Sequence, residues 1–472
     1  MTKYLPTIGV ECHVQFKTKT KLFSEVDNDA RLKEPNSCVS PVDYALPGML
    51  PRLNKEAVLY CIRAGLALGS QISLESRFDR KHYFYPDLPK GYQITQMYQP
   101  IIGPGVVELP SGTKVRVHHA HLEEDAGKLT HEQGYSLIDL NRAGTPLLEI
   151  VSQPDLHSAA DTRDYAKELW RLMTYAGVTY GDLYNGNMRF DINVSVAPEG
   201  STELGTRTET KNLNSFRSVE RAVEYEIKRQ IKVLEKGEKV KQETRGWNDA
   251  TGETTSQRSK EEAQDYRYMP EPDIPPIRLQ QQTVDETAAQ MPKLPAWYRT
   301  EFDGVVPKDL IEVLLDYPQL MAKLAELEDR GAVKKVANLF SSVLLAEENV
   351  SLLNDELPTK GQLLDLVKMN ESSELSSTGT KEVFLKFFDP EMHKKDTRTI
   401  AKELGVVQEN DLGALEAIVD AVLSKPETQQ AQADFRAGQE KVLGFLVGQV
   451  MKESKGKANP SAVQNILRSK LS

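Results

Sequence analysis

The sequence predicts an α+β protein in which a sheet-rich part is followed by helical parts. Up to about residue 290, apolar and polar residues alternate in several runs, as they do in half-buried strands. Residues 269–276 include four prolines, too many for a helix or a central strand, and mark an approaching boundary. From Leu294 apolar residues recur at helical spacing, and from Thr397 short helices follow one another. We therefore expect three domains, at 1–293, 294–396 and 397–472.

The first expected strand, residues 8–16, has an apolar face and a polar face. Its even-numbered residues are apolar and its odd-numbered residues are polar, apart from Gly9. Glu11 and His13 therefore lie side by side on the face opposite the core. Residues 188–196 repeat the pattern with Arg189 and Asp191 on the polar face. For any one such strand, the solvated face of an antiparallel sheet is the alternative explanation.

Acidic residues on these faces favour a hard metal ion. The run 206–211 places Arg207, Glu209 and Lys211 together, and 118–125 ends in three consecutive acids, Glu123 to Asp125. Carboxylates with one imidazole and no thiolate suit Mg²⁺ or Mn²⁺ better than zinc. Neighbouring cationic side chains would suit the charge of a transferring phosphoryl group.

The segment 80–93 interleaves aromatic and basic residues with turn formers, which suits stacking on nucleobases and contact with phosphates. A packed aromatic cluster is the alternative.

In the last domain, Leu443, Leu446 and Val450 share a helical face, and Asn459 and Pro460 begin a further helix. Residues 435–472 carry seven Lys or Arg against two Glu, so we expect either a solvated face or a module that contacts a nucleic-acid backbone.

Composition narrows the function classes. The chain has 472 residues and a net charge of −10, which disfavours attraction to phosphates over the whole surface. It has no membrane-spanning apolar run, no signal sequence and only three widely spaced cysteines, so we expect a cytoplasmic protein without disulfides. No Walker loop, nucleophile elbow or Rossmann fingerprint is present.

Seven segments are familiar as a set, namely 46–51, 80–87, 121–128, 139–150, 211–216, 265–273 and 444–452. They resemble the B-subunit family of bacterial aspartyl/glutamyl-tRNA(Asn/Gln) amidotransferases (GatB/GatE), and the resemblance extends over nearly the whole chain. It implies an antiparallel-sheet "cradle" domain (1–293) that carries the chemistry, an all-α helical domain (294–396) and a small, basic, tRNA-binding tail domain (397–472).

The resemblance also implies a reaction. Within a heterotrimer, ATP would phosphorylate the side-chain carboxylate of misacylated Glu-tRNA(Gln) or Asp-tRNA(Asn). Ammonia released from glutamine by an amidase subunit would then displace phosphate, so that the complex is a C–N ligase, and a small subunit would brace the assembly. No membrane is involved. The alternatives are a non-catalytic tRNA-binding scaffold and a metal-dependent phosphohydrolase.

Residue roles follow from the resemblance. The implied metal ligands are Glu11, His13, Glu124, Asp191 and Glu209, with Glu123 as a further or supporting group. The catalytic set is Glu11, Glu124, Glu209 and Lys211, and the ATP phosphates would contact Lys81, Arg189 and Arg207. The tRNA would contact Tyr83, Tyr85, Lys90 and Tyr92, and in the tail Lys452, Lys455 and Lys457.

Many members of this family carry four zinc-binding cysteines near the N-terminus. The corresponding positions here are Ser24, Val26, Ser40 and Asp43. Cys38 lies two positions before Ser40 and cannot hold a metal alone. We therefore expect Mg²⁺ (or Mn²⁺) as cofactor, ATP as substrate and no structural zinc.

Overall fold

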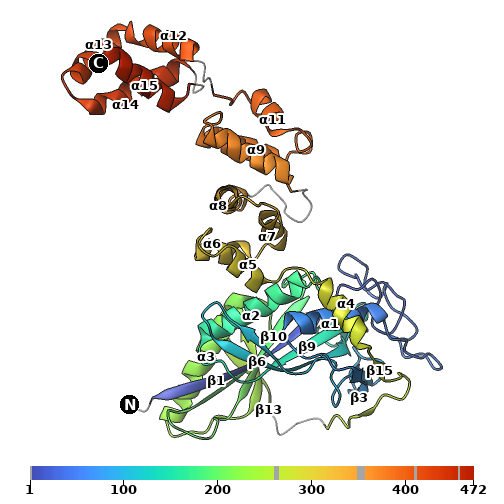
Figure 1. Cartoon of the computed structure of the whole chain (residues 1–472). Helices are drawn as coiled ribbons and strands as arrows, with labels where there is room; N and C mark the ends of the chain where they lie inside the picture. The colour runs from blue at the N-terminus through green and yellow to red at the C-terminus, as the bar shows by residue number, and fades with distance from the viewer. Residues whose placement is uncertain (1–2, 260–264, 348–356, 409–411, 455–457) are drawn as a thin grey trace. The chain divides into compact units, whose positions relative to one another are not determined.

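The computed structural model describes residues 3–259, 265–347, 357–408, 412–454 and 458–472. The chain divides into two compact units, 1–295 and 296–472, which are described separately (Figure 1). The boundary expected between a helical and a tail domain, at 396/397, lies inside the second unit and stays a prediction.

The first unit is built on an eight-stranded sheet. In spatial order its strands are β13 (Glu253–Ser259), β12 (Glu243–Asn248), β11 (Thr208–Leu213), β10 (Met188–Pro198), β1 (Tyr4–Gln15), β9 (Pro146–Ser152), β6 (Lys114–Glu124) and β5 (Gly105–Glu108). The α+β prediction is confirmed. The sheet is antiparallel except between β11 and β12, which run parallel because helix α3 (Phe216–Glu235) connects them as a crossover.

Smaller sheets lie beside the main one. Strands β14 (Met269–Pro270), β3 (Asp79–His82) and β4 (Tyr92–Thr95) form the first, and β15 (Ile277–Arg278) pairs with β2 (Glu75–Ser76). Strands β7 (Lys128–His131) and β8 (Ser136–Asp139) form a separate hairpin. The proline-rich segment thus begins with the short edge strand β14, where a proline is tolerated because an edge strand has an unpaired side.

Helices cover one face of the main sheet. In Figure 1, α1 (Lys55–Ala67), α2 (Ala159–Tyr175) and α3 lie along the strands, and α4 (Gln281–Ala289) packs on α1. The apolar face of β1 enters this core, and Ile8, Cys12 and Val14 are fully buried there. This confirms the predicted alternation of β1 and leaves Glu11 and His13 on the opposite face of the sheet.

The second unit is helical. Its helices begin with α5 (Pro295–Glu301) and continue with α6 (Lys308–Leu314), α7 (Pro318–Ala325), α8 (Arg330–Leu339) with its π-helical extension η2 (Phe340–Leu344), α9 (Lys360–Glu371), α10 (Ser377–Lys386) and α11 (Thr397–Glu403). The last described helices are α12 (Leu412–Leu423), α13 (Gln429–Arg436), α14 (Leu443–Glu453) and α15 (Pro460–Leu471), and short 3₁₀ turns precede α13 and α14.

Helices α12 to α15 share one apolar cluster, which confirms the predicted helical face of α14 through the burial of Leu443, Leu446 and Val450. Asn459 caps α15 by accepting from two backbone N–H groups, as predicted. Helix α11 instead packs against α9 and α10, although the expected tail domain begins at its first residue. Within the described ranges, every helix is too short or too polar to span a lipid bilayer.

Candidate active site

Register brings polar residues from four strands into one row. His121 on β6 lies opposite Glu149 on β9, Glu149 lies opposite His13 on β1, and His13 lies opposite Arg189 on β10. Residues paired across neighbouring strands point to the same face of a sheet. The next row pairs Glu11 with Asp191. The uncovered face of the sheet therefore carries two adjacent rows of charged side chains.

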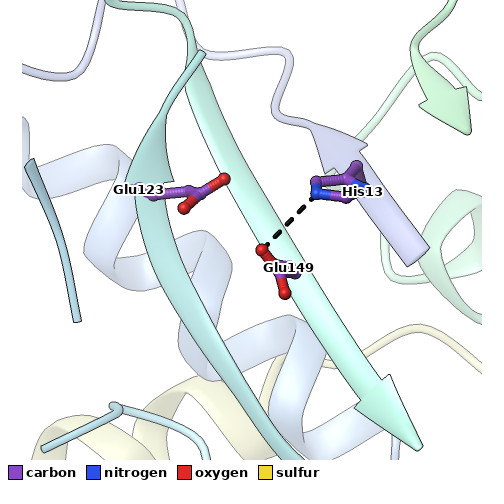
Figure 2. Close-up of side chains that lie close together, drawn as sticks. All are labelled: His13, Glu123 and Glu149. Atoms are coloured by element: carbon purple, nitrogen blue, oxygen red, sulfur yellow. Dashed lines mark ion pairs between the residues drawn. The ribbon is translucent and has the colours of Figure 1, made fainter. Parts of the chain in front are cut away.

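The first group of candidate metal ligands is His13, Glu123 and Glu149, whose ligand atoms all lie within 4.8 Å of one another (Figure 2). His13 Nε2 is 3.4 Å from Glu149 Oε2, and Thr95 Oγ1 donates to Glu123 at 3.1 Å. Burial acts to raise the pKa of Glu149, but His121 and His13 outweigh it and hold this pKa well below its ordinary value. Glu149 is therefore an ionised candidate ligand at neutral pH.

The second group is Glu11, Asp191 and Glu209, again with ligand atoms within 4.8 Å of one another. Lys211 Nζ lies 3.0 Å from Glu209 Oε1 and 3.3 Å from Asp191 Oδ2, so this cation pairs with two of the three carboxylates. Burial, with the charges of Glu149, Glu209 and Asp191, raises the pKa of Glu11 to about 7.

These donor sets fit a hard divalent cation. Two carboxylates with an imidazole, and three carboxylates with one lysine, are oxygen-rich, contain no thiolate and carry excess negative charge. In addition, His13 Nδ1 is buried and has no hydrogen-bond partner among the described residues. When bound, Mg²⁺ would neutralise charge on phosphate and carboxylate oxygens.

Every member of the two groups except Glu209 lines one hollow of about 520 Å³. Lys81, Arg189 and Lys211 also line it, and Lys81 Nζ lies 4.8 Å from the ring centre of Tyr266. Arg189 is held by Asp125, with Nη1 3.3 Å from Oδ2. The hollow thus combines candidate metal ligands with three cations, as the transfer of a phosphoryl group requires.

Glu124 lies outside both groups, unlike the other four predicted metal ligands. Neighbouring residues on a strand point to opposite faces, so Glu123 faces the hollow while Glu124 faces the covered side. There Lys90 Nζ donates to both Glu124 carboxylate oxygens, and the backbone N–H of Ile94 donates to one of them at 2.9 Å. The predicted tRNA contact Lys90 is therefore engaged in a buried ion pair, with 8% of its side chain exposed.

The remaining predicted contacts are spread around the first unit. Tyr83 lines the hollow, and its ring stacks on that of Tyr85 with centroids 4.9 Å apart. The Tyr92 ring lies 4.2 Å from the Arg80 guanidinium. Arg207 precedes β11 and lines a neighbouring hollow of about 480 Å³, which shares Glu11 with the first.

In the tail, Lys452 lies on α14, whereas Lys455 and Lys457 lie outside the described residues. Glu149 is a candidate ligand that the sequence reasoning did not assign. Its signal was present, because Glu149 is a single acid between the buried residues Leu148 and Ile150 in a strand.

The chain matches two family models. The model described as the GatB/GatE catalytic domain covers residues 6–285, and the one described as the GatB domain covers residues 319–471. The chain is 42% identical to a protein of Carboxydothermus hydrogenoformans over 100% of the chain and 99% of that protein, and 45% identical to one of Halorhodospira halophila over 99% of both. Each relative is named as the B subunit of an aspartyl/glutamyl-tRNA(Asn/Gln) amidotransferase.

Proposed function

Because this chain belongs to the GatB/GatE family of tRNA-dependent amidotransferase B subunits, we propose that its 520 Å³ hollow activates and amidates the amino acid of a misacylated tRNA. The substrate is Glu-tRNA(Gln), Asp-tRNA(Asn) or both. The observation that carries the proposal is the meeting of two oxygen-rich ligand groups with Lys81, Arg189 and Lys211 on one face of the sheet.

The reaction has two steps. A side-chain carboxylate oxygen of the aminoacyl group attacks the γ-phosphorus of ATP, and the bond from that phosphorus to the β,γ-bridging oxygen breaks as ADP leaves. Ammonia then attacks the carbonyl carbon, the carbon–oxygen bond to phosphate breaks, and the nitrogen loses a proton. Lys81, Arg189 and Lys211 would bind the phosphate oxygens. The groups His13, Glu123 and Glu149, and Glu11, Asp191 and Glu209, would each hold Mg²⁺, which would supply charge neutralisation there.

The neighbouring hollow suits the nucleoside of ATP. Its lining includes Gly9, Asn193, Leu204 and Arg207. This neighbouring hollow shares Glu11 with the 520 Å³ hollow, which we call the catalytic hollow, so the phosphates of a nucleotide bound there would lie close to the ligand groups. Tyr83 and Tyr85 then remain for the tRNA 3′ end.

The relatives are named as one lettered component of an amidotransferase, which denotes a multi-subunit enzyme. We place this chain in the cytoplasm with an amidase subunit, which supplies ammonia from glutamine, and a small bracing subunit.

The test uses the reconstituted complex and measures ATP cleavage. ATP cleavage that requires misacylated tRNA supports the proposal. If the chain were a non-catalytic tRNA-binding scaffold, substitutions in its candidate metal ligands would leave this cleavage unchanged. A metal-dependent phosphohydrolase would cleave ATP and form its product without glutamine-derived ammonia.

Metal affinity should depend on pH through Glu11. The Glu11 pKa of about 7 means that a proton must leave before this carboxylate binds a cation. Below the pKa the proton competes, so we expect Mn²⁺ to bind roughly tenfold more weakly at about pH 6 than at about pH 8. Titration of the complex with Mn²⁺, followed by electron paramagnetic resonance, measures this. Glu11→Gln should remove the pH-dependent component, and an affinity that is flat with pH in the wild type would contradict the assignment.

Removing residues 412–472 should weaken tRNA binding but spare chemistry. Helices α12 to α15 share one apolar cluster, so the deletion removes a whole folded module, whereas a cut near Phe435 would split the cluster. We expect a severalfold higher KM for tRNA, since phosphate contacts such as Lys452 are lost, and an unchanged kcat with added ammonia at saturating tRNA. An unchanged tRNA affinity would show that the tail does not contact tRNA.

A further inference from the structure

Three histidines stand close together on β6, and none of them is among the candidate metal ligands. The pairing of β6 with β9 shifts its register between Val117 and His119, which leaves His118 as an extra residue on β6. Such a β-bulge re-aims the side chains around it. There the consecutive residues His118 and His119 contact each other, with their Nδ1 atoms 2.7 Å apart, and His119 contacts His121 in turn.

His121 contacts the first group of candidate ligands. Its Nε2 lies 3.6 Å from Glu123 Oε2 and also 3.6 Å from Glu149 Oε2, and 11% of its side chain is exposed. A nitrogen lone pair at this place would face two acceptor oxygens, so Nε2 carries a proton whether the ring is neutral or cationic. The imidazole therefore presents one N–H to two carboxylates of the same group.

The ring of His119 holds the ring of His121 in this orientation. His119 Nε2 lies 3.2 Å from His121 Nδ1, and the two rings stack with their centroids 5.2 Å apart and an angle of 17° between their planes. Burial, together with the charges of His121 and His118, lowers the pKa of His119 to about 4, so this ring is neutral at neutral pH. A neutral imidazole can donate or accept at Nε2, depending on its tautomer. His119 therefore suits the Nδ1 atom of His121 in either protonation state of that ring.

The second group of candidate ligands has an equivalent contact. There Lys211 Nζ lies 3.0 Å from Glu209 and 3.3 Å from Asp191. A carboxylate has two oxygens and turns readily about its last torsion, so a neighbouring N–H that faces one oxygen influences which lone pairs remain for a cation. Removing an outer partner of this kind typically weakens metal binding about 10–100-fold. Each group thus has one nitrogen donor that contacts two of its carboxylates.

We propose that His121 is a positioning residue of the first group, which orients the carboxylates of Glu123 and Glu149 for the cation, and that His119 fixes the ring of His121. The inference rests on the proposed function, because it takes this group as a metal site. The affinity of the group for a divalent cation should then depend on a side chain that is not itself a ligand.

The test measures Mn²⁺ binding to the reconstituted complex by electron spin echo spectroscopy. Nitrogen modulation marks the first group, because His13 supplies an imidazole there and the second group consists of carboxylates. We expect His121→Leu to raise the Mn²⁺ concentration that half-saturates the nitrogen signal about tenfold. The nitrogen-free signal of the second group should stay unchanged, which makes that group an internal control.

Two amide substitutions separate the N–H group from the bulk of the ring. In His121→Gln the amide N–H stands close to the place of Nε2, whereas in His121→Asn the shorter side chain reaches only the place of Nδ1. His121→Gln should therefore restore most of the affinity, and His121→Asn should not. His119→Leu removes the nitrogen that faces His121 and should weaken binding severalfold. His118→Leu is the matched control and should have no effect, because it makes the same change at an exposed neighbour.

Unchanged half-saturation in His121→Leu would overturn the inference, as would equal affinities of His121→Gln and His121→Asn. Loss of part of the nitrogen modulation in His121→Leu at saturating Mn²⁺ would make His121 a ligand and overturn its positioning role. Weaker binding at both groups, with a lower unfolding temperature, would show a purely structural role and overturn the inference too.

The proposed function fails by a different result. A wild-type complex that binds Mn²⁺ with this dependence on His121, but cannot cleave ATP with misacylated tRNA, would overturn that function and leave the inference standing. A wild-type complex that amidates tRNA and binds Mn²⁺ without nitrogen modulation would overturn the inference alone.

Discussion

Glu123→Gln should lower misacylated-tRNA-dependent ATP cleavage at least about a hundredfold, because it removes a charged ligand where phosphoryl-group charge must be neutralised. The Glu123 carboxylate belongs to the group formed with His13 and Glu149, and it faces the catalytic hollow. The glutaminase activity of the partner subunit should survive, since that activity does not use this hollow. Mn²⁺ binding to the complex should weaken in parallel.

Glu124→Gln is the matched control, because it makes the same chemical change one residue further along β6. Its side chain is 2% exposed and its carboxylate accepts two bonds from Lys90. Removing the negative charge leaves a lysine buried without its counter-ion, which costs about 3–5 kcal/mol of stability in comparable pairs. We expect a lower unfolding temperature with Mn²⁺ affinity retained. Loss of Mn²⁺ binding at unchanged stability would restore Glu124 to the metal site and contradict the strand-face argument.

Alternation along single strands could be predicted from the sequence. Period-two patterns in β1 and β10 identified Glu11, His13, Arg189 and Asp191 as face-sharing residues, and all four line the same hollow of about 520 Å³. This succeeded because a strand that is buried on one side must segregate its apolar residues. The helical face of α14 was predictable for the equivalent reason.

Strand order and register could not be predicted in this way. Glu149 lies beside His13 only because β9 pairs with β1. The sequence of the segment 146–152 does not indicate which strand it pairs with. For consecutive acids such as Glu123 and Glu124, which of the two faces the site depends on how β6 is aligned with β9, and the sequence of β6 alone does not give this alignment. Likewise, the parallel pairing of β11 with β12 follows from the helix between them rather than from either strand.

Asp43→Asn should destabilise the first unit by about 3–5 kcal/mol, because it leaves Lys21 buried without its counter-ion. Lys21 is fully buried, and its Nζ donates to Asp43 Oδ2 at 3.0 Å. The backbone N–H of Ser40 donates to the same oxygen at 2.8 Å. The ion pair therefore connects the loop that contains Asp43 to Lys21 in the segment after β1. Asparagine keeps an acceptor for Ser40 but removes the charge.

The double variant Lys21→Met with Asp43→Leu separates charge from packing. Replacing both members of a buried ion pair by apolar residues of similar size is often neutral or stabilising, so the double variant should recover most of the stability that Asp43→Asn loses. Thermal unfolding of the full chain, together with the rate of protease cleavage within residues 24–54, measures both variants. If the double variant were as unstable as Asp43→Asn, the loop would depend on the Ser40 contact and on local geometry rather than on neutralising Lys21.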